Sequence, residues 1–169
     1  MFLDETSAHL NLSKSYGRAP TDKRVVDNAP KGKKERASLL AAVTLRGLEG
    51  AHCLIHPENV NKAAFISYLK TLLPNLKPGS VLVLDNWRVH LGPDVRELVE
   101  KYHCTLLYLP AYSPDFNPIE LLFSKIKAFI KTLRPSTLDR LIQAFNDAVL
   151  TVSPVDAMNT FEHCGYVVQ

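Results

Sequence analysis

Residues 81–85 read Val-Leu-Val-Leu-Asp, an apolar run of strand-forming residues that ends in a carboxylate. A strand that is apolar throughout is typical of a sheet covered on both faces. Functional side chains often follow the carboxyl ends of such strands, so Asp85 is the first candidate site residue. An aspartate that caps an ordinary turn gives the same pattern. The stretch predicts a layered α/β fold and marks one edge of its sheet.

The segments on either side supply the other expected elements. Period-two and all-apolar runs predict strands at residues 1–10, 38–45, 51–55, 81–85 and 105–109. Helical spacing of apolar residues predicts helices over about 61–73, from Pro93, from Pro118, over about 136–150 and near 154–163. A three-stranded meander followed by two β-α-β crossovers gives a mixed five-stranded sheet with helices on both faces. The strand at 105–109 is expected to be buried like its neighbour.

Three carboxylates fall where this fold can bring them together. Asp4 lies in the first strand, Asp85 ends the fourth, and Glu120 opens the helix after Asn117, with 34 residues between Asp85 and Glu120. If the first strand is central, Asp4 and Asp85 lie on neighbouring strands about 5 Å apart. An oxygen-only set of ligands suits Mg²⁺ or Mn²⁺. A pair of such ions can activate water and stabilise the leaving oxygen in phosphodiester cleavage.

Each of these residues also has an ordinary structural explanation. Asn117 is a good N-cap, and Glu120 three positions later would complete a capping box. Asp4 is followed by Glu5, and strand alternation points the two side chains to opposite faces. His90, five residues after Asp85, is a supporting group behind the site, a phosphate donor or an exposed loop residue.

Length and composition exclude several classes of protein. The chain of 169 residues is predicted to form one domain, with a core over about 1–134 and a helical extension over 135–169. No apolar run reaches the ~20 residues that cross a bilayer, so no membrane partner is expected. The three cysteines include no C-x-x-C pair, which argues against a zinc site or a disulfide framework and favours a reduced cytoplasmic compartment.

The charge is unevenly distributed. The net charge is only +3, but residues 14–36 carry eight basic and three acidic side chains. This segment is either a solvated loop or a phosphate-facing surface that includes Lys33 and Lys34. Charge alone does not choose between the two interpretations.

Two longer stretches are more specific than any single residue. Residues 83–90 read Val-Leu-Asp-Asn-Trp-Arg-Val-His, and residues 109–120 read Leu-Pro-Ala-Tyr-Ser-Pro-Asp-Phe-Asn-Pro-Ile-Glu. With the opening Phe-Leu-Asp-Glu-Thr, they resemble the DDE transposases of bacterial insertion sequences in the mariner-type superfamily. The gap of 34 residues between Asp85 and Glu120 matches a common spacing there. The resemblance covers essentially the whole chain.

The resemblance implies a ribonuclease H-like fold in which Asp4, Asp85 and Glu120 are catalytic and hold two Mg²⁺ or Mn²⁺ ions. It implies hydrolysis of DNA at element ends, followed by attack of the freed 3′-OH on target DNA, commonly at a TA step. Lys127 is the first expected phosphate contact. The other expected DNA contacts are Arg88, His90, Lys33 and Lys34.

Transposases of this type carry N-terminal helix-turn-helix domains, whereas this sequence opens at the first catalytic strand. The resemblance therefore predicts the second reading frame of a split transposase, a truncated copy or a catalytic fragment. The expected protein partners are a second copy of the chain, as a homodimer, and a separate helix-turn-helix protein. The expected location is the bacterial cytoplasm, at the nucleoid.

Two other functions remain open. One is a catalytically idle remnant that only binds DNA or a transposase partner. The other is a generic ribonuclease H-like nuclease. The presence of all three carboxylates argues against a decayed site, and the Tyr-Ser-Pro-Asp run at 112–115 disfavours the generic nuclease.

Overall fold

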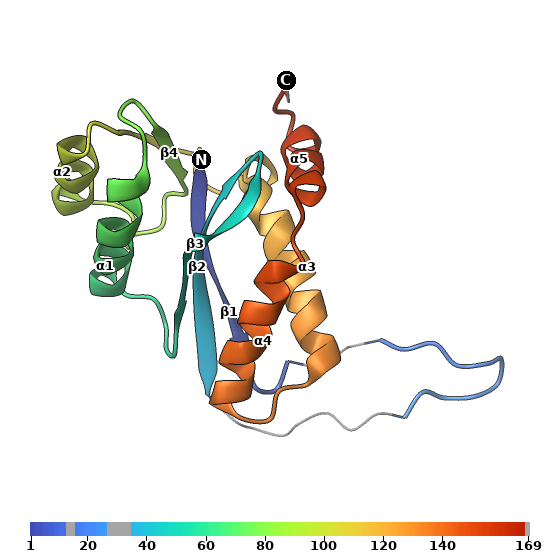
Figure 1. Ribbon diagram of the computed structural model, residues 1–169. Coiled ribbons are helices and arrows are strands. Elements are labelled where there is room, and N and C mark those ends of the chain that lie inside the picture. The colour runs from blue at the N-terminus through green and yellow to red at the C-terminus, as the bar shows by residue number, and fades with distance from the viewer. Residues whose placement is uncertain (13–15, 27–34, 168–169) are drawn as a thin grey trace.

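A computed structural model describes residues 1–12, 16–26 and 35–167, and its centre is one five-stranded sheet (Figure 1). The strands are β1 (Phe2–His9), β2 (Arg36–Thr44), β3 (Gly47–His56), β4 (Val81–Leu84) and β5 (Thr105–Tyr108). Their order across the sheet is β3-β2-β1-β4-β5, which makes β1 the central strand. It pairs antiparallel with β2 and parallel with β4, and β4 pairs parallel with β5. The predicted mixed sheet, with a meander before the crossovers, is confirmed.

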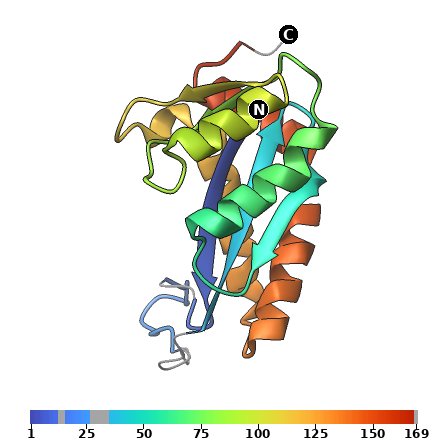
Figure 2. The same cartoon turned by 90° about the vertical axis from the view of Figure 1, so that its left-hand side faces the viewer.

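Helices cover both faces of the sheet (Figures 1 and 2). They are α1 (Lys62–Leu72), α2 (Pro93–Lys101), α3 (Pro118–Leu133), α4 (Leu138–Leu150) and α5 (Pro154–His163). Buried residues of α1 and α2 pack with Leu3 and Leu40, whereas those of α3, α4 and α5 pack with Phe2 and Leu39. Among the described residues, no helix is long and apolar enough to cross a membrane.

The alternation of side chains along β1 assigns its two acids to different layers. Phe2 belongs to the core under α3, α4 and α5, and Leu3 belongs to the core under α1 and α2. Successive side chains of a strand point to opposite faces. Asp4 therefore shares the face of Phe2, and Glu5 shares the face of Leu3.

Helix α3 is the element that brings the third acid to the sheet. It begins at Pro118, whose missing N–H is harmless at the first helical position, and it buries one apolar stripe against β1 and its neighbours. The buried residues of this stripe are Ile119, Leu122, Phe123, Ile126 and Ile130. The helix ends at Leu133, and the C-cap Arg134 that follows has a left-handed backbone with φ 47°. Burying this stripe fixes the position of the first turn and therefore of Glu120.

The expectation that the last strand is buried is wrong. β5 lies at the edge of the sheet, and Leu107 is 53% exposed, whereas Leu106 and Tyr108 pack against the layer of α1 and α2. The side of β5 to which Leu107 points is left open. An all-apolar run marks a strand but does not report how far the helical layers extend over it.

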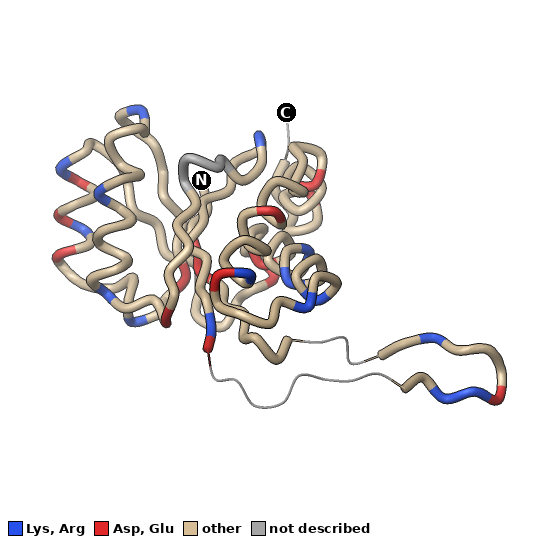
Figure 3. The backbone as a smooth tube through the Cα atoms, turned by 60° about the horizontal axis from the view of Figure 1, so that its bottom comes forward, with Lys and Arg blue, Asp and Glu red and all other residues tan. Residues whose placement is uncertain are grey.

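The basic segment between β1 and β2 is described in part. Residues 16–26 lie away from the sheet, and their side chains, which include Arg18, Lys23 and Arg24, are exposed (Figures 1 and 3). Exposure fits both a solvated loop and a phosphate-facing surface. Lys33 and Lys34, two of the predicted DNA contacts, lie outside the described residues.

Candidate metal centre

The three predicted carboxylates line one pocket of about 460 Å³. In the parallel pairing of β1 with β4, Phe2 is the partner of Val83. Two residues further along each strand, this register brings Asp4 next to Asp85. Glu120 reaches the same pocket from the first turn of α3. The structure therefore places the three acids together, with none on the far side of the sheet.

Asp4 is the most deeply placed of the three acids, with 5% of its surface exposed. Its Oδ1 accepts a hydrogen bond from the Glu5 backbone N–H at 2.8 Å, and its Oδ2 accepts one from Asn117 Nδ2 at 2.7 Å. Burial, together with the negative charges of Glu5, Asp85 and Glu120, raises the pKa of Asp4 to about 8. A divalent cation relieves this repulsion, so the set of donors fits such an ion.

Asn117 supports Asp4 instead of capping its own helix. It occupies the N-cap position of α3, but its side chain makes no capping hydrogen bond. Its amide nitrogen is turned to Asp4, and its buried Oδ1 has no hydrogen-bond partner among the described residues. The expected side-chain cap is therefore wrong, because the amide is oriented to donate to Asp4, and in this orientation its Oδ1 accepts no backbone N–H of α3. Sequence reasoning missed this role, and the only signal was a polar residue three positions before a candidate ligand.

Glu120 does not take part in a capping box, the alternative role that its position in the sequence allows. The capping box would need the Asn117 side chain as a cap, and that cap is absent. Desolvation raises the pKa of Glu120, Lys127 lowers it, and Asp85 and Glu5 raise it further. Glu120 lines both the pocket with Asp4 and Asp85 and an adjacent cleft that Lys127 also lines. Its carboxylate is thus left for the site.

Asp85 accepts two hydrogen bonds, both on the same carboxylate oxygen. Its Oδ1 accepts from the Trp87 backbone N–H at 2.9 Å and lies 2.6 Å from His90 Nδ1. Burial acts to raise the pKa of Asp85, but the bonds from His90 and Trp87 outweigh it and hold that pKa below its ordinary value. Asp85 is therefore ionised, and Oδ2 is the oxygen left to bind a cation.

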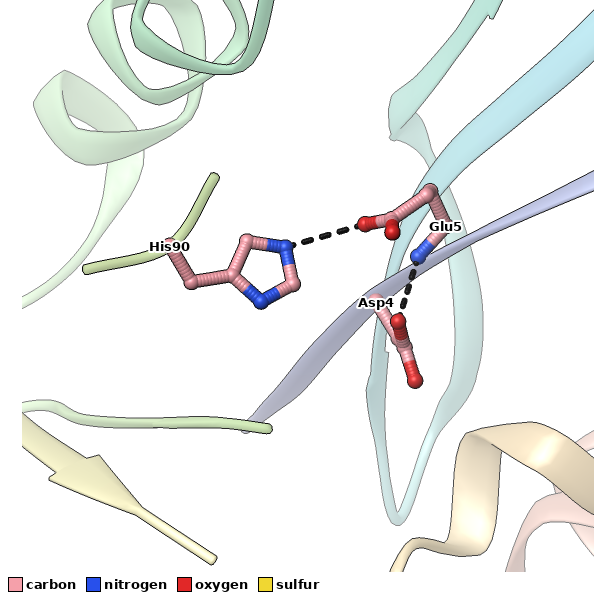
Figure 4. A group of neighbouring side chains, drawn as sticks. All are labelled: Asp4, Glu5 and His90. Atoms are coloured by element: carbon pink, nitrogen blue, oxygen red, sulfur yellow. Dashed lines mark hydrogen bonds and ion pairs between the residues drawn. The ribbon is translucent and has the colours of Figure 1, made fainter. Parts of the chain in front are cut away.

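His90 connects this carboxylate to the next strand. Its side chain is fully buried, and its Nε2 lies 2.9 Å from Glu5 Oε2 (Figure 4). Burial lowers its pKa, but the hydrogen bonds to Asp85 and Glu5 outweigh it and raise the pKa of His90 to about 9. Ionised carboxylates only accept hydrogen bonds, so both ring nitrogens donate and the imidazole is a cation. The expected contact of His90 with DNA is wrong, because the ring is buried and both nitrogens are engaged.

A second grouping of possible ligands overlaps the predicted set. Ligand atoms of Asp4, Glu5 and His90 all lie within 4.8 Å of one another (Figure 4). His90 donates from both ring nitrogens and has no lone pair to offer a cation. The three carboxylates that line the pocket are therefore the better oxygen ligands for a metal.

Two of the other predicted contacts lie at the mouth of the site. Arg88 is exposed and lines both the pocket and the adjacent cleft of about 490 Å³. Lys127 is half-buried on the flank of α3 and lines that cleft. Both cations thus lie beside the carboxylates, at the edge of the openings.

Comparison with known proteins gives a consistent result. A family model described as DDE superfamily endonuclease matches residues 1–142. The Transposable element Tc1 transposase of Caenorhabditis elegans is 33% identical over 76 residues, which are 45% of this chain and 28% of that protein. The chain thus spans less than a third of this curated relative.

Solved structures of Mos1 transposase share the fold. The Mos1 strand transfer complex matches with a TM-score of 0.75 at 18% identity, over 95% of this chain and 50% of that chain. The Mos1 mariner paired end complex with Mn has a TM-score of 0.75 at 16% identity, over 97% of this chain and 53% of that chain. The Mos1 transposase catalytic domain with raltegravir and Mg has a TM-score of 0.69 at 15% identity, over 97% of this chain and 79% of that chain. The expected ribonuclease H-like α/β fold is confirmed.

Proposed function

The chain belongs to the DDE superfamily endonucleases, and from this premise we propose that it is a transposase catalytic domain. It cleaves DNA at the ends of a mobile element and joins the freed 3′-OH to target DNA. One observation carries the proposal: Asp4, Asp85 and Glu120, from three separate elements, line one pocket. An oxygen-only site of this kind suits Mg²⁺ or Mn²⁺.

The residues have distinct roles in the proposed reaction. Asp4, Asp85 and Glu120 would hold the metal ions with their carboxylate oxygens. When bound, the ions supply an activated nucleophile at neutral pH and stabilise the leaving oxygen. Arg88 and Lys127 bind the phosphate backbone and align the scissile bond. No covalent enzyme intermediate is required, because water and then the DNA 3′-OH are the nucleophiles.

An idle DNA-binding remnant is the weaker alternative. A remnant under no demand for catalysis has no need to keep acids in mutual repulsion. Here Asp4 is buried beside Glu5, Asp85 and Glu120, and this environment raises its pKa to about 8. Such an arrangement is costly for the fold and useful only when a cation occupies the site.

We also propose the partners that the sequence resemblance implies. A helix-turn-helix protein supplies recognition of the element ends, and two copies of this chain act together on paired ends and on a TA target. The Mos1 transposase paired-end complex with the left transposon end supports, by analogy, the part of this proposal that concerns paired ends. A DNA substrate agrees with the expected cytoplasmic, nucleoid-associated location.

The direct test is a nicking assay with the purified chain. Supercoiled plasmid should be converted to the open-circular form in Mg²⁺ or Mn²⁺ and should stay supercoiled in EDTA. Re-addition of Mn²⁺ after EDTA should restore nicking. Cleavage that persists in EDTA, or no cleavage at any metal concentration, would reject the proposed activity.

Lys127→Ala is expected to weaken DNA binding by a similar factor for every sequence tested. Lys127 lines the cleft beside Glu120, so the variant removes a phosphate contact and no base contact. The slope of log affinity against log salt should fall by about one. Fluorescence anisotropy over a salt series measures both quantities.

Lys101→Ala is the matched control, because Lys101 is an exposed lysine at the end of α2, on the opposite face of the sheet. It should leave affinity and salt slope unchanged. Tight, salt-insensitive binding of the wild-type chain to one sequence would contradict this prediction.

A further inference from the structure

We propose that Glu5 and His90 are positioning residues that fix the Asp85 side chain in its cation-binding orientation. The proposal rests on the proposed function in one respect, because Asp85 must bind a cation. It adds a support for that ligand through a chain of hydrogen bonds that runs from Glu5 through the buried His90 ring to Asp85.

The chain of contacts crosses the centre of the fold. Glu5 Oε2 lies 2.9 Å from His90 Nε2, and His90 Nδ1 lies 2.6 Å from Asp85 Oδ1. Strand β1 thus supplies both parts of the site. Asp4 faces the pocket, and Glu5, on the opposite face, anchors the ring that holds Asp85. His90, in the middle of the chain of contacts, is the most buried: its side chain is 0% exposed, against 18% for Glu5 and 43% for Asp85.

His90 is itself held on every side. Its ring packs against Phe65, with centroids 4.5 Å apart, and edge-to-face against Trp87 at 5.7 Å. Its backbone N–H donates to the Trp87 carbonyl at 2.8 Å, and its carbonyl accepts from the Tyr108 hydroxyl at 2.9 Å. An imidazole fixed in this way cannot follow a rotating carboxylate, so it determines where Asp85 lies.

This arrangement decides which oxygen meets the cation. Asp85 Oδ1 is committed to His90 and to the Trp87 backbone N–H, which leaves Oδ2 for the pocket. A half-exposed aspartate without these bonds would sample several rotamers and would lose that freedom on binding metal. Partners that orient metal ligands typically change metal affinity by about 10- to 100-fold.

Two substitutions at one position separate positioning from packing. In His90→Asn the amide nitrogen falls near the former Nδ1 and can still donate to Asp85. In His90→Gln it falls near the former Nε2 and can donate only to Glu5. Both variants remove the ring from the same packed site. Isothermal titration with Mn²⁺ on the full chain without DNA gives the affinity, and thermal unfolding gives the stability.

We expect His90→Gln to weaken Mn²⁺ binding by about 10- to 100-fold, and His90→Asn to stay within about threefold of the wild-type affinity. Glu5→Gln, which removes the charge that anchors the ring, should weaken binding by about tenfold. Glu97→Gln is the matched control, because Glu97 is exposed on α2, and it should change nothing.

The outcomes separate this proposal from the proposed function. If the wild-type chain binds Mn²⁺ and both His90 variants weaken binding equally, in step with lost thermal stability, His90 is a packing residue and the positioning role is overturned. Unchanged affinity in His90→Gln overturns it as well. A wild-type chain that binds no Mn²⁺ overturns the metal site, and this proposal with it.

Discussion

Asp85→Asn is expected to abolish metal-dependent nicking, with a loss of at least about 10³-fold. Metal ions supply several kcal/mol of transition-state stabilisation, and each 1.36 kcal/mol is about tenfold in rate. In the wild-type chain, Asp85 Oδ1 accepts hydrogen bonds from His90 Nδ1 and the Trp87 backbone N–H. The amide oxygen of the substituted side chain can accept the same two bonds. The fold should therefore persist while the charge that binds the cation is lost. Quantified plasmid nicking in Mn²⁺ measures the effect.

Glu120→Gln should cause a loss of the same order, and it separates a metal ligand from a capping residue. Glutamine serves a capping box as well as glutamate does, so a purely capping role predicts full activity. Asp139→Asn, at an exposed position in the first turn of α4, is the control and should cleave normally. Undiminished nicking by the Asp85 or Glu120 variant would remove that residue from the proposed site.

The metal-free protein is expected to lose stability as pH rises, chiefly through Asp4. The folded pKa of Asp4 is about 8, against an ordinary value of 3.8. Below pH 4 both states are protonated and Asp4 contributes nothing. Between pH 4 and 8 the unfolded chain releases the proton while the folded chain retains it, so the free energy of unfolding falls. The loss reaches several kcal/mol near pH 8 and is constant above it, on the order expected for a shift of this size.

Urea unfolding in EDTA at several pH values, with wild type and Asp4→Asn compared, isolates this effect. His90, whose pKa is raised from 6.5 to about 9, also stabilises the fold. Its contribution is complete below pH 6.5 and is lost as pH rises through 9, in both proteins. The difference between the two proteins therefore reports Asp4, and the variant should have the flatter profile. Parallel profiles would show that Asp4 is ionised without metal.

Mn²⁺ should reverse the trend in the wild-type chain. The cation competes with the proton on Asp4, so the stabilisation by a fixed Mn²⁺ concentration should be larger at pH 8 than at pH 6. Asp4→Asn should gain little from the metal at either pH. The same urea titrations, repeated with Mn²⁺ in place of EDTA, make this comparison.

Much of the fold was predictable because local patterns encode it. Alternating and continuous apolar runs locate the strands, Pro118 fixes the start of α3, and the spacing of Asp4, Asp85 and Glu120 follows from the order of these elements. Strand alternation also predicts that Asp4 and Glu5 point to opposite faces. The role of Glu5 is not predictable in this way, because its contact with His90 depends on a loop that returns to the sheet.

The unpredicted features all depend on competition in three dimensions. Asn117 has two acceptable roles, capping α3 or binding Asp4, and only the packed structure chooses between them. The sequence places His90 in a loop, and only the folded structure shows that its ring is buried against Phe65 and Trp87. Leu107 is as apolar as a core residue, but it is 53% exposed at the edge strand β5.

The Asn117 side chain, which binds Asp4 and does not cap α3, limits how heat-resistant this protein can become while it stays active. A missing side-chain cap costs about 0.5–2 kcal/mol. Serine at this position would restore a cap on α3 and remove the buried amide oxygen, but its hydroxyl is too short to reach Asp4. Selection for thermal tolerance alone, in evolution or in the laboratory, would thus act against the residue that holds Asp4. It would yield proteins that are more stable but have an inactive metal centre.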